Sequence, residues 1–158
     1  MPDAVLGTTR ELASGAFKDL RAVVAGLPAD ALDWRPAGPE TNSIAVLATH
    51  SMNSTRLWLT VAAGLPRPPR DRDAEFRATG SDPTTLLDLI DALATECGVA
   101  LDAAAGTDWG SPREWTRGDG EVIRLTAAYA VMHAVEHLRG HVDQASLTRH
   151  LWEASHER

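Results

Sequence analysis

Four long segments of this chain place apolar residues at the spacing of an amphipathic α-helix, and proline- or glycine-rich stretches separate them. The segments cover about residues 5–27, 42–63, 82–105 and 123–152. In the first, the 3.6-residue stripe consists of Leu12, Ala13, Ala16, Phe17, Leu20, Val23, Val24 and Leu27. No strand pattern competes with these helices, although residues 121–123 could form a short extended piece. Four amphipathic helices in one domain predict an all-α fold, a four-helix bundle.

Capping residues indicate where three of these helices begin. Thr8 and Glu11 could form a capping box near the start of the first helix. Asn42 and Ser43 are both good N-caps for the second. The pair Asp82-Pro83 places a cap before a proline in the first helical position of the third.

Two of the connections are longer than a tight turn. Residues 28–41 should contain a short helical turn held by Trp34, and residues 106–122 contain Trp109 and Trp115. Loops of this length with aromatic anchors often cover a binding site. Trp109 and Trp115 are therefore candidates for lining a substrate pocket, although aromatic residues in loops are more often structural.

Length and composition limit the classes of protein to consider. The 158 residues correspond to a single domain, 1–158, that can bury its own core. The formal net charge is -7, and the arginines are scattered among acids, which argues against binding to nucleic acid or an anionic membrane. Cys97 is the single cysteine and is expected to be a buried core residue. No secretory signal or membrane span is evident, so we expect a cytoplasmic protein.

A ladder of histidines, His133, His137 and His141, stands near the C-terminus and is followed by Gln144. On an α-helix this four-residue spacing puts the rings on one face, about 6 Å apart along the axis, so neighbouring pairs can bind one metal ion. Zinc, nickel and iron all accept neutral imidazole. A third ligand from another helix would complete a site with an open position.

His50 is the other histidine in a segment that looks buried, and it is the candidate third ligand. A lone polar ring among apolar residues is costly unless a partner satisfies it. The alternative interpretation stays open at this point: the ladder could be a solvated stripe, and His50 could bond a backbone carbonyl.

The residues that carry a family resemblance span nearly the whole chain. They are the segments 32–36 (Leu-Asp-Trp-Arg-Pro), 42–50 (Asn-Ser-Ile-Ala-Val-Leu-Ala-Thr-His) and 133–144, which holds the ladder and Gln144. This pattern resembles the DinB-like (DinB/YfiT) superfamily of metal-binding four-helix bundles. The resemblance implies a metal triad of His50, His137 and His141, with Gln144 as a trailing glutamine and His133 as a residue that either supports the metal ligands or faces the substrate. The ending His141-Val142-Asp143-Gln144 departs from the commoner His-Arg-Gly-Gln, which leaves the subfamily open.

The resemblance also implies a function, which we state as an expectation. Characterised relatives include transferases and isomerases that use low-molecular-weight thiols, so a metal-dependent thiol S-transferase-like enzyme is the leading hypothesis, with a divalent metal (zinc, nickel or iron) activating a small thiol or water. The alternatives are a non-catalytic metal-binding or stress-response protein, and a metal-dependent hydrolase. Residues 133–137 also match the HxxEH motif of inverted zinc proteases, but only 17 residues follow His141. Family members often dimerise through helix faces, so we expect a homodimer.

Overall fold

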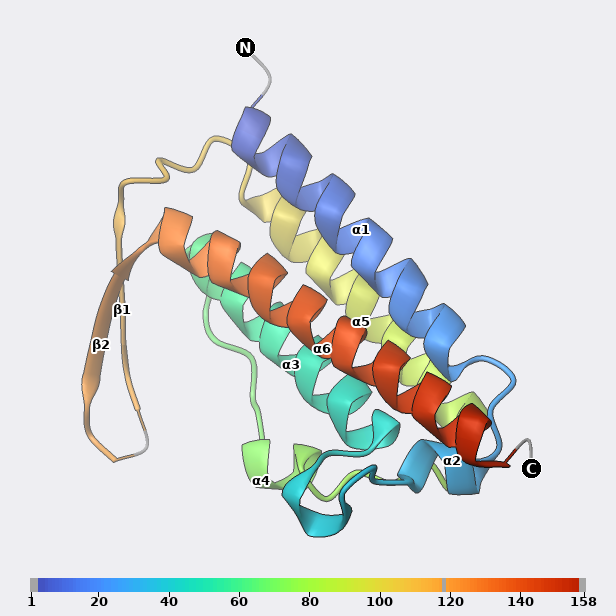
Figure 1. Cartoon of the computed structure of the whole chain (residues 1–158). Helices are drawn as coiled ribbons and strands as arrows, with labels where there is room; N and C mark the ends of the chain where they lie inside the picture. The colour runs from blue at the N-terminus through green and yellow to red at the C-terminus, as the bar shows by residue number, and fades with distance from the viewer. Residues whose placement is uncertain (1–2, 118, 157–158) are drawn as a thin grey trace.

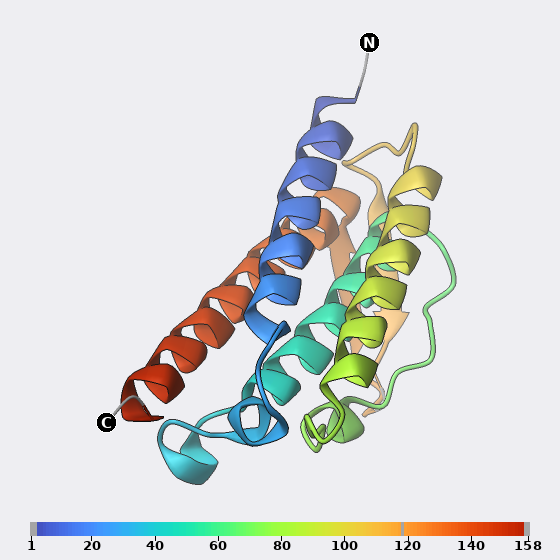
Figure 2. The same ribbon diagram turned by 90° about the vertical axis from the view of Figure 1, so that its right-hand side faces the viewer.

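Four long helices dominate the computed structural model, which describes residues 3–117 and 119–156. They are α1 (Ala4–Val24), α3 (Ile44–Ala62), α5 (Pro83–Ala103) and α6 (Ala127–His156). The helices lie side by side, and α3 and α1 each pack against both α5 and α6 (Figures 1 and 2). The predicted all-α class is confirmed. In the described part of the chain, no helix is long and apolar enough to cross a membrane.

Side-chain caps explain where the helices begin. Ser43 accepts a hydrogen bond from the Val46 N–H, as the sequence predicted for α3. Asp82 caps α5 ahead of the proline at its first position. The predicted capping box of α1 is wrong, because the helix begins earlier, at Ala4, and its cap is Asp3.

Three short elements, α2 (Ala29–Asp33), the 3-10 helix η1 (Gly38–Glu40) and α4 (Arg72–Glu75), occupy the connections at one end of the long helices (Figure 1). The short helical turn predicted within residues 28–41 is α2. The Asp33 carboxylate accepts the Gly80 N–H at 2.6 Å, which ties the segment after α2 to the segment before α5. A Cβ atom at Gly80 would collide with the side chain of Leu32, so the two segments approach closely only because residue 80 is glycine.

A β-hairpin precedes α6, whereas the sequence indicates only a short extended piece at residues 121–123. Strands β1 (Pro112–Thr116) and β2 (Val122–Thr126) pair antiparallel, with Trp115 opposite Ile123. The prediction that the last helix begins at Ile123 or Arg124 is therefore wrong, since α6 begins at Ala127. Exposure alternates along β2, as expected of a strand with one face toward the protein. The hairpin stands beside α3 and the first turns of α6 (Figure 1).

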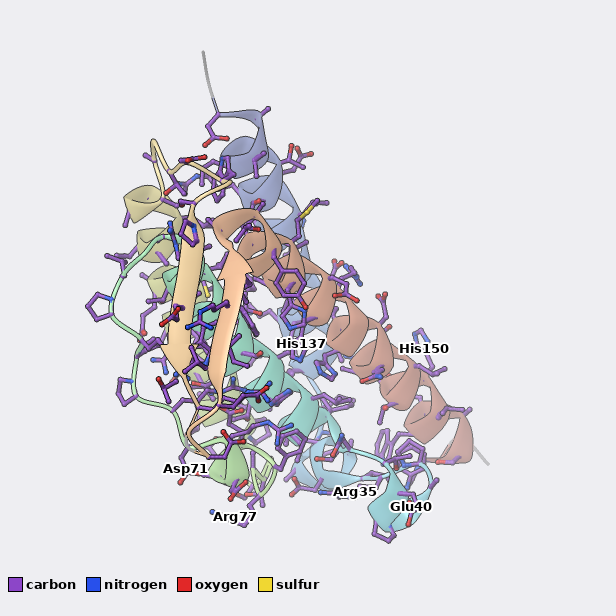
Figure 3. The ribbon with its side chains drawn as sticks, turned by 90° about the vertical axis from the view of Figure 1, so that its left-hand side faces the viewer. Arg35, Glu40, Asp71, Arg77, His137 and His150 are labelled. Atoms are coloured by element: carbon purple, nitrogen blue, oxygen red, sulfur yellow. The ribbon has the colours of Figure 1, made fainter. Side chains whose placement is uncertain are left out.

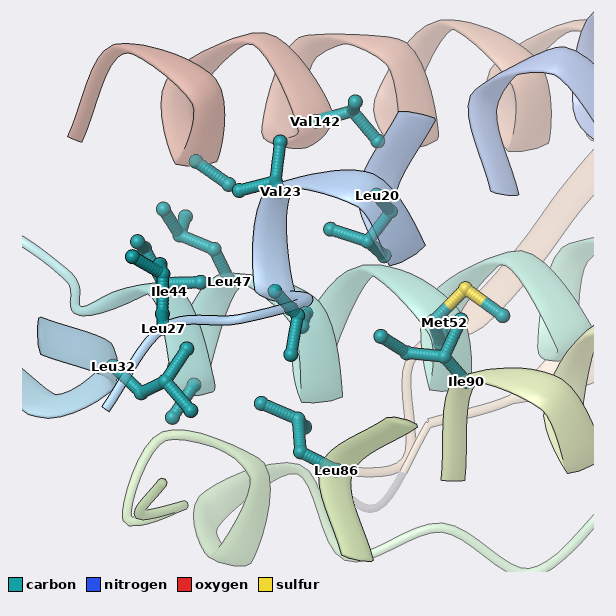
Figure 4. Packing of buried hydrophobic residues seen from close by; sticks show 14 of the residues in the cluster. Leu20, Val23, Leu27, Leu32, Ile44, Leu47, Met52, Leu86, Ile90 and Val142 are labelled. Carbon is teal, nitrogen blue, oxygen red and sulfur yellow. The ribbon is translucent and has the colours of Figure 1, made fainter. Parts of the chain in front are cut away.

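The core lies between the four long helices and forms two clusters. In the first, Leu20, Met52, Ile90 and Val142 come from the four different helices and pack together (Figure 4). In the second, nearer the hairpin, Ala130 and Ala134 of α6 are fully buried. Leu12, expected on the buried stripe of α1, is instead 54% exposed.

Candidate metal centre

The packing of α3 against α6 brings three histidines together. His50 on α3 is buried, and His137 and His141 on α6 are half-buried. One ligand nitrogen from each lies within 4.8 Å of the other two. The ring centroids of His50 lie 5.1 Å from His137 and 5.2 Å from His141. The three residues that the resemblance implied as a metal triad therefore converge on one point between two helices.

The pair on α6 already has the spacing of metal ligands. Nε2 of His137 and Nε2 of His141 lie 3.2 Å apart. With metal–nitrogen distances of 2.0–2.1 Å, two nitrogens of a tetrahedral site are about 3.3 Å apart. Two lone pairs facing each other at this distance repel unless a proton or a cation lies between them. The donor set fits zinc, nickel or iron.

A carboxylate orients the ring of His50. Nδ1 of His50 lies 2.9 Å from Oε2 of Glu75 in α4, and both groups are buried. Arg70 donates two hydrogen bonds to the same carboxylate, at 2.6 and 2.7 Å. An Nη2 atom of Arg70 also approaches His50 Nδ1 at 3.3 Å, but the shorter contact with Glu75 assigns the proton to Nδ1. The lone pair of His50 is then on Nε2, where it is available to a metal ion.

Gln144 orients His141 in the same way. Its Oε1 atom lies 2.8 Å from Nδ1 of His141, and an amide oxygen can only accept, so Nδ1 donates. The lone pair of His141 is then on Nε2, the atom that faces His137. Nδ1 of His137 is buried and has no hydrogen-bond partner among the described residues. Two of the three rings thus have a partner that fixes which nitrogen can bind a metal.

The surroundings keep the α6 histidines neutral. Burial lowers the pKa of His137 to about 3, with further contributions from the charges of His141, His50, His133 and Arg70. Burial also lowers the pKa of His141, and the hydrogen bond with Gln144 only partly opposes this. For Glu75, burial would raise the pKa, but the hydrogen bonds from Arg70 and His50 outweigh it and lower the pKa. Neutral imidazoles beside an ionised carboxylate are in the protonation states that metal binding requires.

A cavity of about 620 Å³ opens in front of the triad, within the range of small-molecule sites. His50 and His137 lie in its wall. The other lining residues are Ser54, Leu57, Trp58, Arg67, Arg70, Arg72, Trp115, Arg117, Asp119 and His133. Figure 3 shows His137 on the side of the molecule where the hairpin stands, while His150 lies farther along α6. The hairpin and the α3–α5 connection therefore supply much of the cavity wall.

Two candidates for the substrate pocket, His133 and Trp115, line this cavity. The ring centroid of His133 lies 4.6 Å from Trp58 and 5.5 Å from His137, one turn along α6. Trp109 does not line the cavity. Its indole N–H donates to Asp3 at 2.9 Å, so it anchors the loop to the start of α1 instead.

Two further residues with reactive side chains, Glu136 of the HxxEH motif and Cys97, do not belong to the triad. The side chain of Glu136 is 81% exposed and contacts His133 at 3.5 Å, which does not place it as the general base of an HxxEH protease. Cys97 is buried in the second core cluster, and burial raises its pKa to about 12, so it is a poor nucleophile.

Sequence reasoning missed Glu75, Arg70 and Trp58. Glu75 and Arg70 stand in or near the four-residue helix α4, and Trp58 is one of many apolar residues on α3. Their roles depend on where the α3–α5 connection folds back over His50. One local signal was present: a buried histidine without a sequence-local partner requires a buried polar partner from elsewhere in the chain.

Comparison with known proteins gives a family and a fold. The model of the DinB superfamily matches residues 13–145, which include all three histidines. A crystal structure of a conserved protein from Enterococcus faecalis is similar, with a TM-score of 0.70 and 16% sequence identity over 92% of this chain and 95% of that one. At this identity the likeness shows the fold alone. No curated protein matches the sequence.

Proposed function

Because this chain belongs to the DinB superfamily, we propose that His50, His137 and His141 hold one divalent metal ion and that the protein is a metal-dependent thiol S-transferase. The observation that carries the proposal is the convergence of three histidine nitrogens within 4.8 Å in and beside the wall of a cavity. Three protein ligands leave a position open for a further ligand, which distinguishes a catalytic site from a closed structural one.

A bound divalent metal would act as a Lewis acid that lowers the pKa of a thiol or a water molecule. The protein's own contribution is to fix the ligands. Glu75 and Gln144 hold Nδ1 of His50 and of His141, so that the opposite nitrogen of each ring stays unprotonated. Imidazole accepts zinc, nickel and iron, and the proposal covers these three metals.

The cavity supplies the rest of the site. Trp58 and Trp115 form an aromatic wall, with ring centroids 5.0 Å apart in an edge-to-face arrangement. Such a wall is apolar and shields part of the cavity from water. His133 lies between this wall and His137, so it is placed to contact a substrate.

The test is a thiol-conjugation assay on zinc- and nickel-loaded protein, with 1-chloro-2,4-dinitrobenzene as electrophile and a panel of small thiols. The S–H bond of the thiol breaks, a carbon–sulfur bond forms, and chloride and a proton leave to solvent. We expect thiol-dependent product in the wild type and its loss in His137→Ala. Full activity in that variant contradicts the proposal, and ester hydrolysis without thiol transfer would favour a hydrolase instead.

We also propose that the protein is a homodimer. A groove between α1 and α6 is lined by Leu12 and Met132, which are 54% and 71% exposed. Glu136 and Arg139 lie along the same groove and offer both signs of charge. A two-fold interface buries one patch against itself, and a patch with apolar residues and both charges is compatible with that symmetry.

A further inference from the structure

The cavity in front of the triad collects positive charge. Four arginines line it, Arg67, Arg70, Arg72 and Arg117, although the chain as a whole has a formal net charge of -7. Among the described residues that line it, Asp119 alone is acidic. The cavity lining is therefore basic, whereas the protein as a whole is acidic.

Two of these arginines are neutralised by carboxylates. Arg70 makes its two hydrogen bonds to Glu75, behind His50. Arg117 pairs with Glu121 at 2.6 Å, within the turn region of the hairpin. The oxygen Oδ1 of Asp119 accepts the Glu121 N–H and holds the same turn. The charges of Arg70 and Arg117 are therefore paired within the protein.

Arg67 and Arg72 have a different environment. The guanidinium of Arg67 lies 5.2 Å from the ring centroid of Trp115, and that of Arg72 lies 4.8 Å from Phe76. Arg67 also donates to the Thr116 carbonyl at 3.4 Å. Within residues 3–117 and 119–156, neither guanidinium forms an ion pair with a carboxylate. Aromatic stacking holds both groups at the cavity while leaving their donors available.

The electrostatics of Arg67 point the same way. Partial burial lowers its pKa, and the charge of Arg70 lowers it further. An anion bound beside Arg67 would favour the charged guanidinium and so oppose both effects. Guanidinium groups match the geometry of carboxylate and phosphate oxygens, which they bind with paired hydrogen bonds.

We propose that this cavity binds an anionic substrate, whose carboxylate or phosphate group is held by Arg67 and Arg72. The body of the substrate lies along Trp58 and Trp115, and its reacting end points toward His137, which stands in the wall of the same cavity. That the reacting end of the substrate is a thiol rests on the proposed function. The anion site itself is made by residues outside the histidine triad.

The first test is calorimetric titration of metal-free protein at low ionic strength, with inorganic phosphate and with 3-mercaptopropionate as probes. We expect at least one probe to bind, and the double variant Arg67→Gln/Arg72→Gln to weaken that binding by about tenfold. Arg77→Gln is the matched control, because Arg77 is exposed near α4 and does not line the cavity (Figure 3). The tighter probe tells whether the site prefers carboxylate or phosphate. Binding of neither probe, or binding that the double variant leaves unchanged, overturns the proposal.

A second test separates this proposal from the thiol function. Cobalt-loaded protein is titrated with 3-mercaptopropionate and with its neutral amide, and the sulfur-to-cobalt absorption band reports thiol binding. In wild type and in Arg77→Gln, we expect the acid to bind about tenfold tighter than the amide. In the double variant, we expect the acid and the amide to bind with equal affinity. Equal binding in wild type contradicts the anion site while the thiol function stands. If the absorption band appears with neither the acid nor the amide, the thiol function is contradicted. The calorimetric titration alone then decides whether the anion site exists.

Discussion

Oε2 of Glu75 lies 2.9 Å from Nδ1 of His50, and both side chains are buried. The two residues come from α4 and α3, so the contact links the α3–α5 connection to the centre of the molecule. A carboxylate on one nitrogen of an imidazole fixes the tautomer and raises the basicity of the other nitrogen. Glu75 is thus a positioning residue for the candidate metal centre.

Replacing Glu75 by glutamine should weaken metal binding. The change removes the negative charge that holds the Nδ1 proton of His50, and losses of this kind reduce metal affinity by about 10- to 100-fold. The measurement is the zinc dissociation constant from competition with a chromophoric chelator. Glu136→Gln is the matched control, because Glu136 is an exposed acid on α6 beside the ladder. Equal affinity of Glu75→Gln and wild type would contradict the role assigned to Glu75.

The stability of the metal-free protein should fall as the solution becomes acidic. His137 has a pKa of about 3 in the folded protein against 6.5 in an unfolded chain. Between these values the unfolded chain binds the extra proton, so the free energy of unfolding decreases as pH falls from about 6.5 toward about 3. Urea unfolding across this range, in wild type and in His137→Gln, measures the effect. We expect the steeper loss in wild type, and parallel curves would contradict the neutral, buried state of His137.

Gly80→Ala should destabilise the protein. The added Cβ would collide with the side chain of Leu32 and separate the two segments that Asp33 ties together. Overpacking of this kind costs about 1–3 kcal/mol. Gly98→Ala is the matched control, since nothing lies within 4 Å of a Cβ there and alanine stabilises a helix interior by about 0.5–1 kcal/mol relative to glycine. Chemical denaturation should therefore show a lower free energy of unfolding than wild type for Gly80→Ala and a higher one for Gly98→Ala. A change of the same sign in both variants would contradict the close approach at Gly80.

Met132→Glu should convert the proposed dimer to a monomer. Met132 is 71% exposed in the groove between α1 and α6, and a charge there would be buried unpaired in a two-fold interface. Light scattering after size-exclusion chromatography measures the mass of each species. Val99→Glu on α5 is the control, since Val99 is also exposed, at 62%, but does not line that groove. A monomeric wild type, or a dimeric Met132→Glu, would contradict the assigned face.

The helices and the triad could be predicted because their signals are local or repeated. Ser43 and Asp82 mark helix starts by bonding backbone within three residues. His137 and His141 lie four residues apart, and this spacing places two residues on the same face of any α-helix. His50 stands out as the other histidine in a segment that looks buried, the family motif also includes it, and the packing of α3 on α6 brings it to the other two histidines.

The remaining features depend on tertiary contacts that leave weak traces in the sequence. The sequence predicts the start of the last helix within strand β2, because five residues are too few to separate the periodicity of a strand from that of a helix. Glu75 and Arg70 gain their roles only when the α3–α5 connection folds over His50. Trp109 and Trp115 share one loop, but Trp109 bonds Asp3 and Trp115 lines the cavity, a difference set by the path of the chain.

The most direct test of the metal centre is the metal content of purified protein, measured by plasma mass spectrometry. Wild type is compared with His50→Ala, His137→Ala and His141→Ala, and with His150→Ala as a control for an exposed histidine on the same helix. Circular dichroism establishes that each variant is folded. We expect about one divalent metal ion per chain in wild type and His150→Ala, and little in the three triad variants. A folded wild type that contains no metal and takes up neither zinc nor nickel when these are added would contradict the proposed metal centre.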